Sequence, residues 1–188
     1  SAAWLRFRRL FLHLILEGGK PHHVLHSACV TDGNGRTALL IGQENAGKTS
    51  LLTALLQRGF LQVTDDYAVL DTENLDVIAL PTGVTAEKPF FAHFPEFLDT
   101  RKPSRRFYCQ RRWQWTVSLS SRYKAAATGS RSQPTHLFFV QPEFSSAGKV
   151  TSCSREEAAW WLFNARMENP WSESAALART NGHQRKLF

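Results

Sequence analysis

The stretch LLIGQENAGKTSLL, residues 39 to 52, constrains the fold of this chain more than any other feature. Gly42, Gly47, Lys48 and Thr49 match the pattern G-x-x-x-x-G-K-[ST], whose backbone N–H groups wrap around phosphate oxygens. An apolar run precedes the loop and a leucine-rich run follows it, as a strand and a helix would. The motif therefore predicts a strand, a phosphate loop and a helix that together bind a nucleoside triphosphate.

The loop also supplies two side chains with chemical roles. Lys48 would place its amine against the terminal phosphates, and Thr49 would offer its hydroxyl to Mg²⁺. The carboxylate of Glu44 must point away from the phosphates. The predicted nucleotide contacts are Gly42, Gln43, Glu44, Asn45, Ala46, Gly47, Lys48, Thr49 and Ser50.

A pair of adjacent carboxylates, Asp65 and Asp66, interrupts an apolar run seventeen residues after Lys48. A magnesium–nucleotide site needs a carboxylate to hold the metal, directly or through water. With two, one can bind Mg²⁺ while the other accepts a proton from an attacking hydroxyl. The structural alternative is a polar turn between two strands.

Two absent motifs narrow the class of nucleotide-binding protein. The sequence contains neither the guanine-recognition pattern N-K-x-D nor the transporter signature L-S-G-G-Q. A kinase for a peptide, a protein or a small metabolite remains, with ATP and Mg²⁺ as its cofactors. A regulatory module that binds ATP without turning it over is the alternative from another class.

Length and composition indicate one domain over residues 1 to 188, with 43% hydrophobic residues and a net charge of +7. We expect an amphipathic helix at 4–17 and a basic tail at 179–188. The chain has three widely spaced cysteines, and no signal peptide is evident. Both observations favour a reducing, cytoplasmic location. The apolar runs are shorter than the roughly 20 residues that span a bilayer.

Local patterns predict the remaining elements. Strands are expected at 23–30, 36–42, 60–71, 76–80 and 113–119, with a turn at 32–35 that makes the first two a hairpin, and a core strand at 135–142. A mobile loop is expected at 120–134. Helices are expected at 48–58, with Leu51, Leu52, Leu55 and Leu56 buried, and at 154–167, with Ser154 as its N-cap.

Two further clusters carry weaker signals. His22, His23, His26 and Cys29 suggest zinc, but on one strand they divide between the two faces. Residues 101–112 contain six cations among aromatic side chains. We interpret this segment as a solvated basic loop or as a clamp for an acidic substrate or for transition-state charge. A nucleic-acid surface is the least favoured interpretation.

The stretch VLHSACVTDGNGRTALLIGQENAGKTSLLTALLQRGFLQVTDDYAVLD, residues 24 to 71, resembles the core of the HPr kinase/phosphorylase family and its smaller relatives. Those proteins share a strand with a Leu-His or Met-His pair, a hairpin, a phosphate loop, a helix ending in Arg-Gly and a strand carrying Asp-Asp. The late LFFV run and the REEAAWWLF helix also resemble the smaller relatives. About a quarter of the chain is covered.

The resemblance implies an α/β fold with a P-loop kinase core related to phosphoenolpyruvate carboxykinase, in which helices flank a mixed sheet. It implies ATP-dependent transfer to a Ser hydroxyl on a peptide or protein, and a possible homo-oligomer. Asp65 would be the base and Asp66 a metal ligand, or the reverse, with His26 beside the acceptor.

The chain also departs from the family pattern. Ser50 stands where the family usually has Glu, and the second family signature is not recognisable. We therefore expect neither phosphorylase activity nor HPr as the substrate. Ribosomally made peptides, on which some relatives act, are one possible substrate class.

Overall fold

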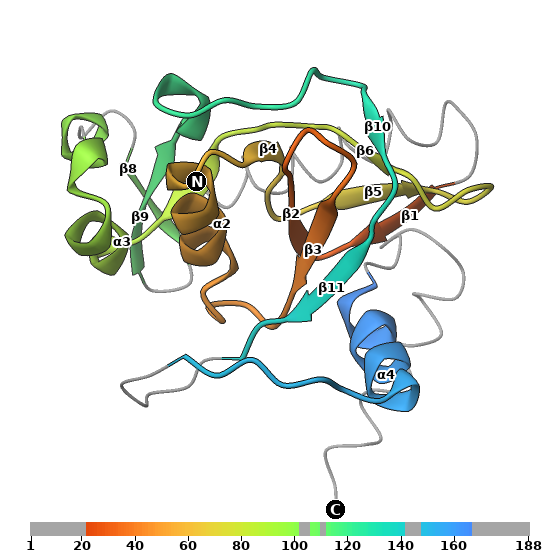
Figure 1. Cartoon of the computed structure of the whole chain (residues 1–188). Coiled ribbons are helices and arrows are strands. Elements are labelled where there is room, and N and C mark those ends of the chain that lie inside the picture. The colour runs from red at the N-terminus through yellow and green to blue at the C-terminus, as the bar shows by residue number, and fades with distance from the viewer. Residues whose placement is uncertain (1–21, 102–105, 110–111, 142–147, 167–188) are drawn as a thin grey trace, which may run out of the picture.

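The structure is a computed structural model that describes residues 22–101, 106–109, 112–141 and 148–166 (Figure 1). It is a mixed α/β structure with several small sheets and few helices. The helix expected at 4–17 and the tail expected at 179–188 lie outside the described residues. Within those residues, no helix combines the length and the apolar character needed to cross a membrane.

The predicted hairpin around residues 32 to 35 is confirmed. β2 (Ser27–Thr31) and β3 (Thr37–Ile41) pair in antiparallel register. Asp32 Oδ1 accepts hydrogen bonds from the main-chain N–H groups of Asn34 and Arg36, at 2.8 and 3.0 Å. This side-chain cap holds the turn, as Asp commonly does at such positions, and it sets the register that leads β3 into the phosphate-loop motif.

The strands of the described residues form three sheets with mostly antiparallel pairing, where one mixed sheet was expected. One sheet has the order β11-β3-β2-β4. Its β11–β3 pair is parallel, whereas the other strand pairs of the described residues are antiparallel. The other sheets have the orders β1-β5-β6-β10 and β7-β9-β8. The strands not yet bounded are β1 (His22–Leu25), β4 (Leu61–Thr64), β5 (Ala68–Asp71), β6 (Val77–Ile78), β7 (Val84–Ala86), β8 (Arg106–Cys109), β9 (Arg112–Val117), β10 (Arg131–Ser132) and β11 (His136–Phe139).

The segments β1–β2 and β4–β5 run antiparallel and bend at the same place, so they link the sheet that contains β1 and β5 to the sheet that contains β2 and β4. The strand expected over 23–30 is broken at His26, because β1 pairs with β5 while β2 pairs with β4. The strand expected over 60–71 is interrupted at Asp65-Asp66, as predicted. Leu25 is opposite Ala68 and Cys29 is opposite Thr64, so the two interruptions face each other.

Helices are few. α2 (Lys48–Gln57) confirms the predicted helix after the loop, and Gly59 follows its C-cap with a φ of 93°. The others are α3 (Lys88–His93), α4 (Arg155–Ala165) and the 3-10 helices η1 (Pro95–Thr100) and η3 (Leu119–Ser121). β10 and the last two residues of η3 lie in the segment 120–134, which was expected to be a mobile loop.

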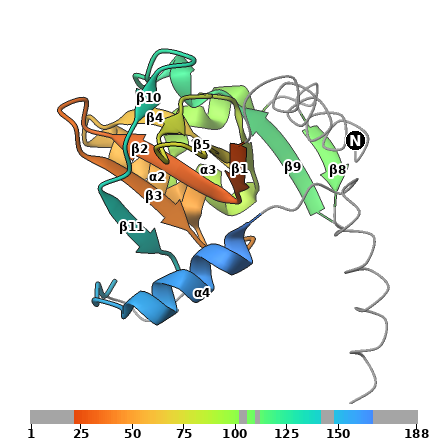
Figure 2. The same ribbon diagram turned by 90° about the vertical axis from the view of Figure 1, so that its right-hand side faces the viewer.

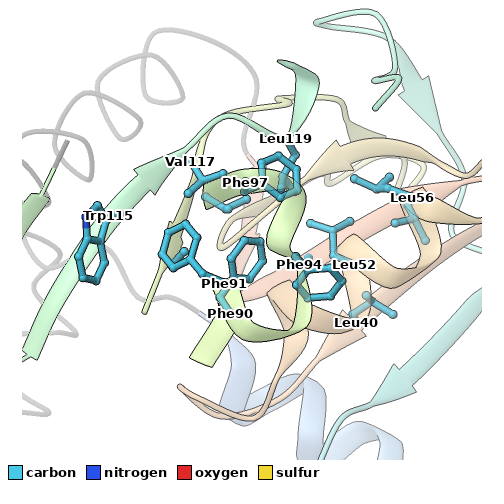
Figure 3. Close-up of a cluster of buried hydrophobic side chains, with 14 residues drawn as sticks. Leu40, Leu52, Leu56, Phe90, Phe91, Phe94, Phe97, Trp115, Val117 and Leu119 are labelled. Carbon is cyan, nitrogen blue, oxygen red and sulfur yellow. The ribbon is translucent and has the colours of Figure 1, made fainter. Parts of the chain in front are cut away.

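The sheet β11-β3-β2-β4 separates two hydrophobic cores. On one side, α2 packs with α3, η1 and the β7-β9-β8 sheet (Figure 3). The labelled members of that core are Leu40, Leu52, Leu56, Phe90, Phe91, Phe94, Phe97, Trp115, Val117 and Leu119. On the other side, Leu39, Ile41 and Val63 pack against strands β5 and β6 and against α4. The phosphate-loop motif therefore begins on a strand buried on both faces.

The structure corrects two burial predictions. Leu51 is 37% exposed, whereas Leu52 and Leu56 are buried and Leu55 is half-buried. The predicted core strand at 135–142 corresponds to β11, which is largely exposed at the end of its sheet, with Leu137 and Phe138 each 40% exposed. An apolar run alone does not distinguish an edge strand from a central one.

The C-terminal helix begins as predicted. Ser154 caps α4 through a capping box with Glu157, in which each side chain bonds the other's backbone N–H, at 3.2 and 2.9 Å. At its other end, the Ala165 carbonyl accepts a hydrogen bond of 2.8 Å from the His26 N–H. Figure 2 shows α4 lying beyond the β11 end of the sheet.

We expect Leu52→Ala to lower the free energy of unfolding by about 2–5 kcal/mol, because the Leu52 side chain is fully buried. Leu51→Ala, one position along the same helix, should cost less than about 1 kcal/mol. Denaturant unfolding of both variants measures the difference. Equal losses would contradict the packing of α2.

Candidate functional site

The phosphate-loop motif forms a tight turn between β3 and α2. Asn45 and Gly47 have positive φ angles of 64° and 94°. The Ala46 N–H donates to the Gln43 carbonyl at 3.2 Å. Gly47 is the N-cap of α2, so the loop passes directly into the positive end of a helix.

The first glycine of the motif is required by packing as well. A Cβ on Gly42 would lie 2.5 Å from the Val140 carbonyl oxygen, a separation that side chains do not tolerate. Val140 follows β11, and its N–H donates to the Ile41 carbonyl at 2.6 Å. The end of β11 therefore supports the start of the loop, a contact that the sequence motif did not reveal.

Lys48, the first residue of α2, is a buried cation beside the loop, with 6% of its surface exposed. Its Nζ donates to the carbonyl oxygens of Gly42 and Gln43, each at 2.9 Å. Burial lowers the pKa of the Lys48 amine below its ordinary value, and the carboxylates of Asp66, Asp65 and Glu44 oppose that shift. The amine thus lies within electrostatic reach of both members of the acid pair.

Asp65 meets the loop directly. The Thr49 hydroxyl lies 3.2 Å from both Oδ1 and Oδ2 of Asp65, and Asp65 is 1% exposed. Asp66 is half-buried and has a φ of 66°, in the left-handed region. A residue other than glycine in that region is uncommon and is often found at functional sites. Asp65 and Asp66 therefore differ in both exposure and backbone conformation.

His26 reaches the same region through strand register. It lies at the bend between β1 and β2, opposite the Asp65–Tyr67 turn, since Leu25 pairs with Ala68. Its backbone is held by the Ala165 carbonyl of α4. The structure thus brings His26, the loop and the acid pair to one part of the molecule.

The side chains at this site fit a magnesium ion that takes some of its ligands from the protein and the others from phosphate and water. Within the described ranges, no group of three or more His, Cys, Asp and Glu side chains could hold a metal. Mg²⁺ is usually bound by one or two carboxylates together with phosphate oxygens and water. The Thr49 hydroxyl and the Asp65 carboxylate, in contact with each other, match that partial ligand set.

The exposure of the remaining loop residues varies. Gln43, Glu44 and Asn45 are exposed, Ala46 is buried, and Ser50 is half-buried. The predicted contacts therefore form one continuous loop, but three of its side chains face solvent. Since the motif acts through backbone N–H groups, exposure of these side chains is compatible with phosphate binding.

The cysteine and histidine cluster does not form a shared site around Cys29. Cys29 is fully buried within β2, and burial raises the pKa of its thiol to about 12. A metal-ligating cysteine must be a thiolate, which this environment disfavours. His23 is exposed on β1, beyond the bend at His26.

Searches with this sequence against models of known protein families and against curated proteins find no match.

Gly42→Ala should lower the free energy of unfolding by about 1–3 kcal/mol, because its methyl group would collide with the Val140 main chain. Gly148→Ala is the matched control, since a Cβ there meets nothing within 4 Å. Thermal unfolding followed by circular dichroism compares the two variants. An unchanged melting temperature for Gly42→Ala would contradict the contact between the loop and the end of β11.

Proposed function

We propose that this chain is an ATP- and Mg²⁺-dependent kinase that transfers the γ-phosphate to a hydroxyl group, most simply a serine, of a peptide or protein. The observation that carries the proposal is the contact of Thr49 with the buried carboxylate of Asp65, beside the buried amine of Lys48. The resemblance of residues 24–71 to HPr-kinase-like proteins supports the peptide or protein acceptor and a P-loop kinase core.

Burial of these charges supports a functional role. Charged side chains are seldom fully buried unless they are paired, because removal from water is costly. Here one buried cation and one buried carboxylate occur next to a phosphate-binding motif. Buried charges next to one another are typical of active sites.

The loop and Lys48 account for binding of the triphosphate. The N–H groups of a loop that leads into a helix N-terminus attract phosphate oxygens. The Lys48 amine bonds the carbonyls of Gly42 and Gln43, so it is already held over the loop. From that position it can exchange a carbonyl partner for a phosphate oxygen, which is a stronger, charge-assisted acceptor.

Asp65 and Asp66 would divide the remaining work. Bound Mg²⁺ would neutralise phosphate charge. The hydrogen bond between Thr49 and Asp65 supports these two residues as its protein ligands. Asp66 is more exposed than Asp65 and lies within electrostatic reach of Lys48. We assign Asp66 as the base that takes the proton of the acceptor hydroxyl while that oxygen bonds to the γ-phosphorus and ADP leaves.

This assignment exchanges the roles first expected for the two acids. His26, at the bend opposite them, would orient the base or the acceptor. Because phosphoryl transfer requires little covalent help, the contribution of all these groups is positioning and electrostatics.

The metal assignment predicts a magnesium-dependent effect of Thr49→Val. We expect its affinity for ATP to fall about tenfold in Mg²⁺ and to change little in EDTA, because the lost hydroxyl would contact the nucleotide through the metal. Isothermal titration calorimetry under both conditions measures this effect. Thr116→Val, at an exposed position on β9, is the control and should match the wild type. Equal weakening with and without Mg²⁺ would argue against a metal at Thr49.

The base assignment predicts that Asp66→Asn slows transfer by at least about a hundredfold, while nucleotide binding persists. Transfer is measured with γ-labelled ATP and serine-containing peptides. The control is Asp99→Asn, an exposed acid on η1. Wild-type transfer by Asp66→Asn would remove Asp66 as the base. Binding of Mg-ATP without transfer to any acceptor would favour the regulatory alternative.

A further inference from the structure

One face of the β8–β9 hairpin carries aromatic and arginine side chains well away from the phosphate loop in sequence. In this antiparallel pair Arg106 is opposite Trp115, and Tyr108 is opposite Trp113. Directly opposed residues place their side chains on the same face of a sheet. Arg106, Tyr108, Trp113 and Trp115 therefore share one face, and Arg112 lies on the other.

This face runs from the core into solvent. Trp115 is 3% exposed and meets Phe91 edge to face in the core shown in Figure 3. Further along the hairpin, Trp113 is 48% and Tyr108 55% exposed, and their rings meet at a centroid distance of 5.3 Å. The buried core thus continues as an exposed pair of aromatic rings. Exposed clusters of this kind commonly mark interaction sites.

Two guanidinium groups lie against these rings. Arg106 stacks over Trp113 at 3.9 Å from the ring centroid, and Arg101 lies 4.9 Å from that of Trp115. Neither arginine forms an ion pair with a carboxylate in the described part of the chain. Arg112, on the opposite face, differs because it pairs with Glu87 at 3.3 Å. The charge on the aromatic face is therefore not neutralised by a described acid.

We propose that this aromatic–arginine face, made of Arg101, Arg106, Tyr108 and Trp113, docks an acidic segment of the acceptor peptide. The inference rests on the proposed function, because it identifies the peptide that brings the hydroxyl. A guanidinium stacked on an aromatic ring keeps its N–H edge free for bidentate bonds to a carboxylate. The exposed rings of Tyr108 and Trp113 offer apolar contact to the rest of the peptide.

Two features favour a peptide over a nucleic acid. Base stacking needs an open ring face, and Arg106 covers one face of Trp113 while Tyr108 packs against the same ring. In addition, β8 is an edge strand, since among the described residues it pairs with β9 alone. The outer edge of such a strand can pair with an extended peptide backbone.

The position of the hairpin is consistent with delivery to the site. In Figures 1 and 2 the turn end of the β8–β9 hairpin points toward the same end of the molecule as the loop before α2. A peptide held along the hairpin would then run toward the side of the molecule where this loop lies.

The test measures peptide binding separately from nucleotide binding. A fluorescein-labelled peptide of alternating Glu and Ser is titrated with the full chain and followed by fluorescence anisotropy. The comparison ligands are a Gln–Ser peptide, a Lys–Ser peptide and single-stranded oligothymidylate, all of the same length. The variants are Arg106→Gln, Arg106→Glu and Trp113→Leu. Arg36→Gln is the control, since Arg36 is 82% exposed in the β2–β3 turn.

We expect the wild type to bind the Glu–Ser peptide at least about tenfold more tightly than the Gln–Ser peptide. Arg106→Gln and Trp113→Leu should each weaken that binding about tenfold, and Arg36→Gln should not. Arg106→Glu should instead favour a Lys–Ser peptide. In calorimetry, Arg106→Gln should bind Mg-ATP with the affinity of the wild type. In transfer assays, this variant should have a higher KM for the peptide and an unchanged kcat.

The proposal is overturned if the Glu–Ser and Gln–Ser peptides bind equally, or if Arg106→Gln binds as Arg36→Gln does. Tighter binding of oligothymidylate than of the Glu–Ser peptide would also overturn it in favour of a nucleic acid. The proposed function fails separately, if no Mg-ATP binding is seen by calorimetry. In that case selective binding of the Glu–Ser peptide would still support the aromatic–arginine face as a docking surface.

Discussion

The hydrogen bond between the Thr49 hydroxyl and the Asp65 carboxylate connects the two parts of the chain that make the candidate site. Thr49 lies in the first turn of α2, and Asp65 directly follows strand β4. Asp65 is nearly inaccessible to solvent, and the buried Lys48 amine lies nearby. The carboxylates of Asp66, Asp65 and Glu44 all favour the charged form of the Lys48 amine, which offsets part of the cost of burying that charge. The site and the local stability of the fold therefore depend on the same few groups.

The bend shared by two antiparallel segments explains how the acid pair comes to face the loop. The Tyr67 N–H donates to the Asp65 carbonyl at 2.8 Å, and the Thr64 hydroxyl donates to the Tyr67 carbonyl at 2.7 Å. These bonds close a turn at the point where His26 interrupts the neighbouring strand. A straight ladder would alternate Asp65 and Asp66 across the two faces of the sheet. The turn instead gives the second acid a left-handed conformation and greater exposure.

Elements with strong local signals were predictable from the sequence. The Asp-Gly-Asn-Gly turn, the glycine that follows α2 and the Ser154–Glu157 capping box each depend on residues close together in the chain. The phosphate loop and the acid pair were also identified, and their proximity is present in the structure. Their chemical roles and the bound nucleotide remain predictions.

Features that depend on distant contacts were not predictable. The run at 135–142 has the composition of a core strand, yet β11 lies at the end of its sheet and is largely exposed. The exposure of Leu51 depends on what packs around α2, which periodicity does not specify. The division into three sheets follows from which strands pair across the bend, and a strand pattern alone does not name its partner.

The close approach of Val140 to Gly42 bears on how sequences of this architecture should be compared. Glycine at that position is demanded by the neighbouring backbone whether or not a phosphate ever binds. A related chain without the proposed activity would still retain this glycine, so its presence alone says little about that activity. Lys48 and the two aspartates have no comparable steric reason to persist, so under the proposed function their retention is the more informative observation.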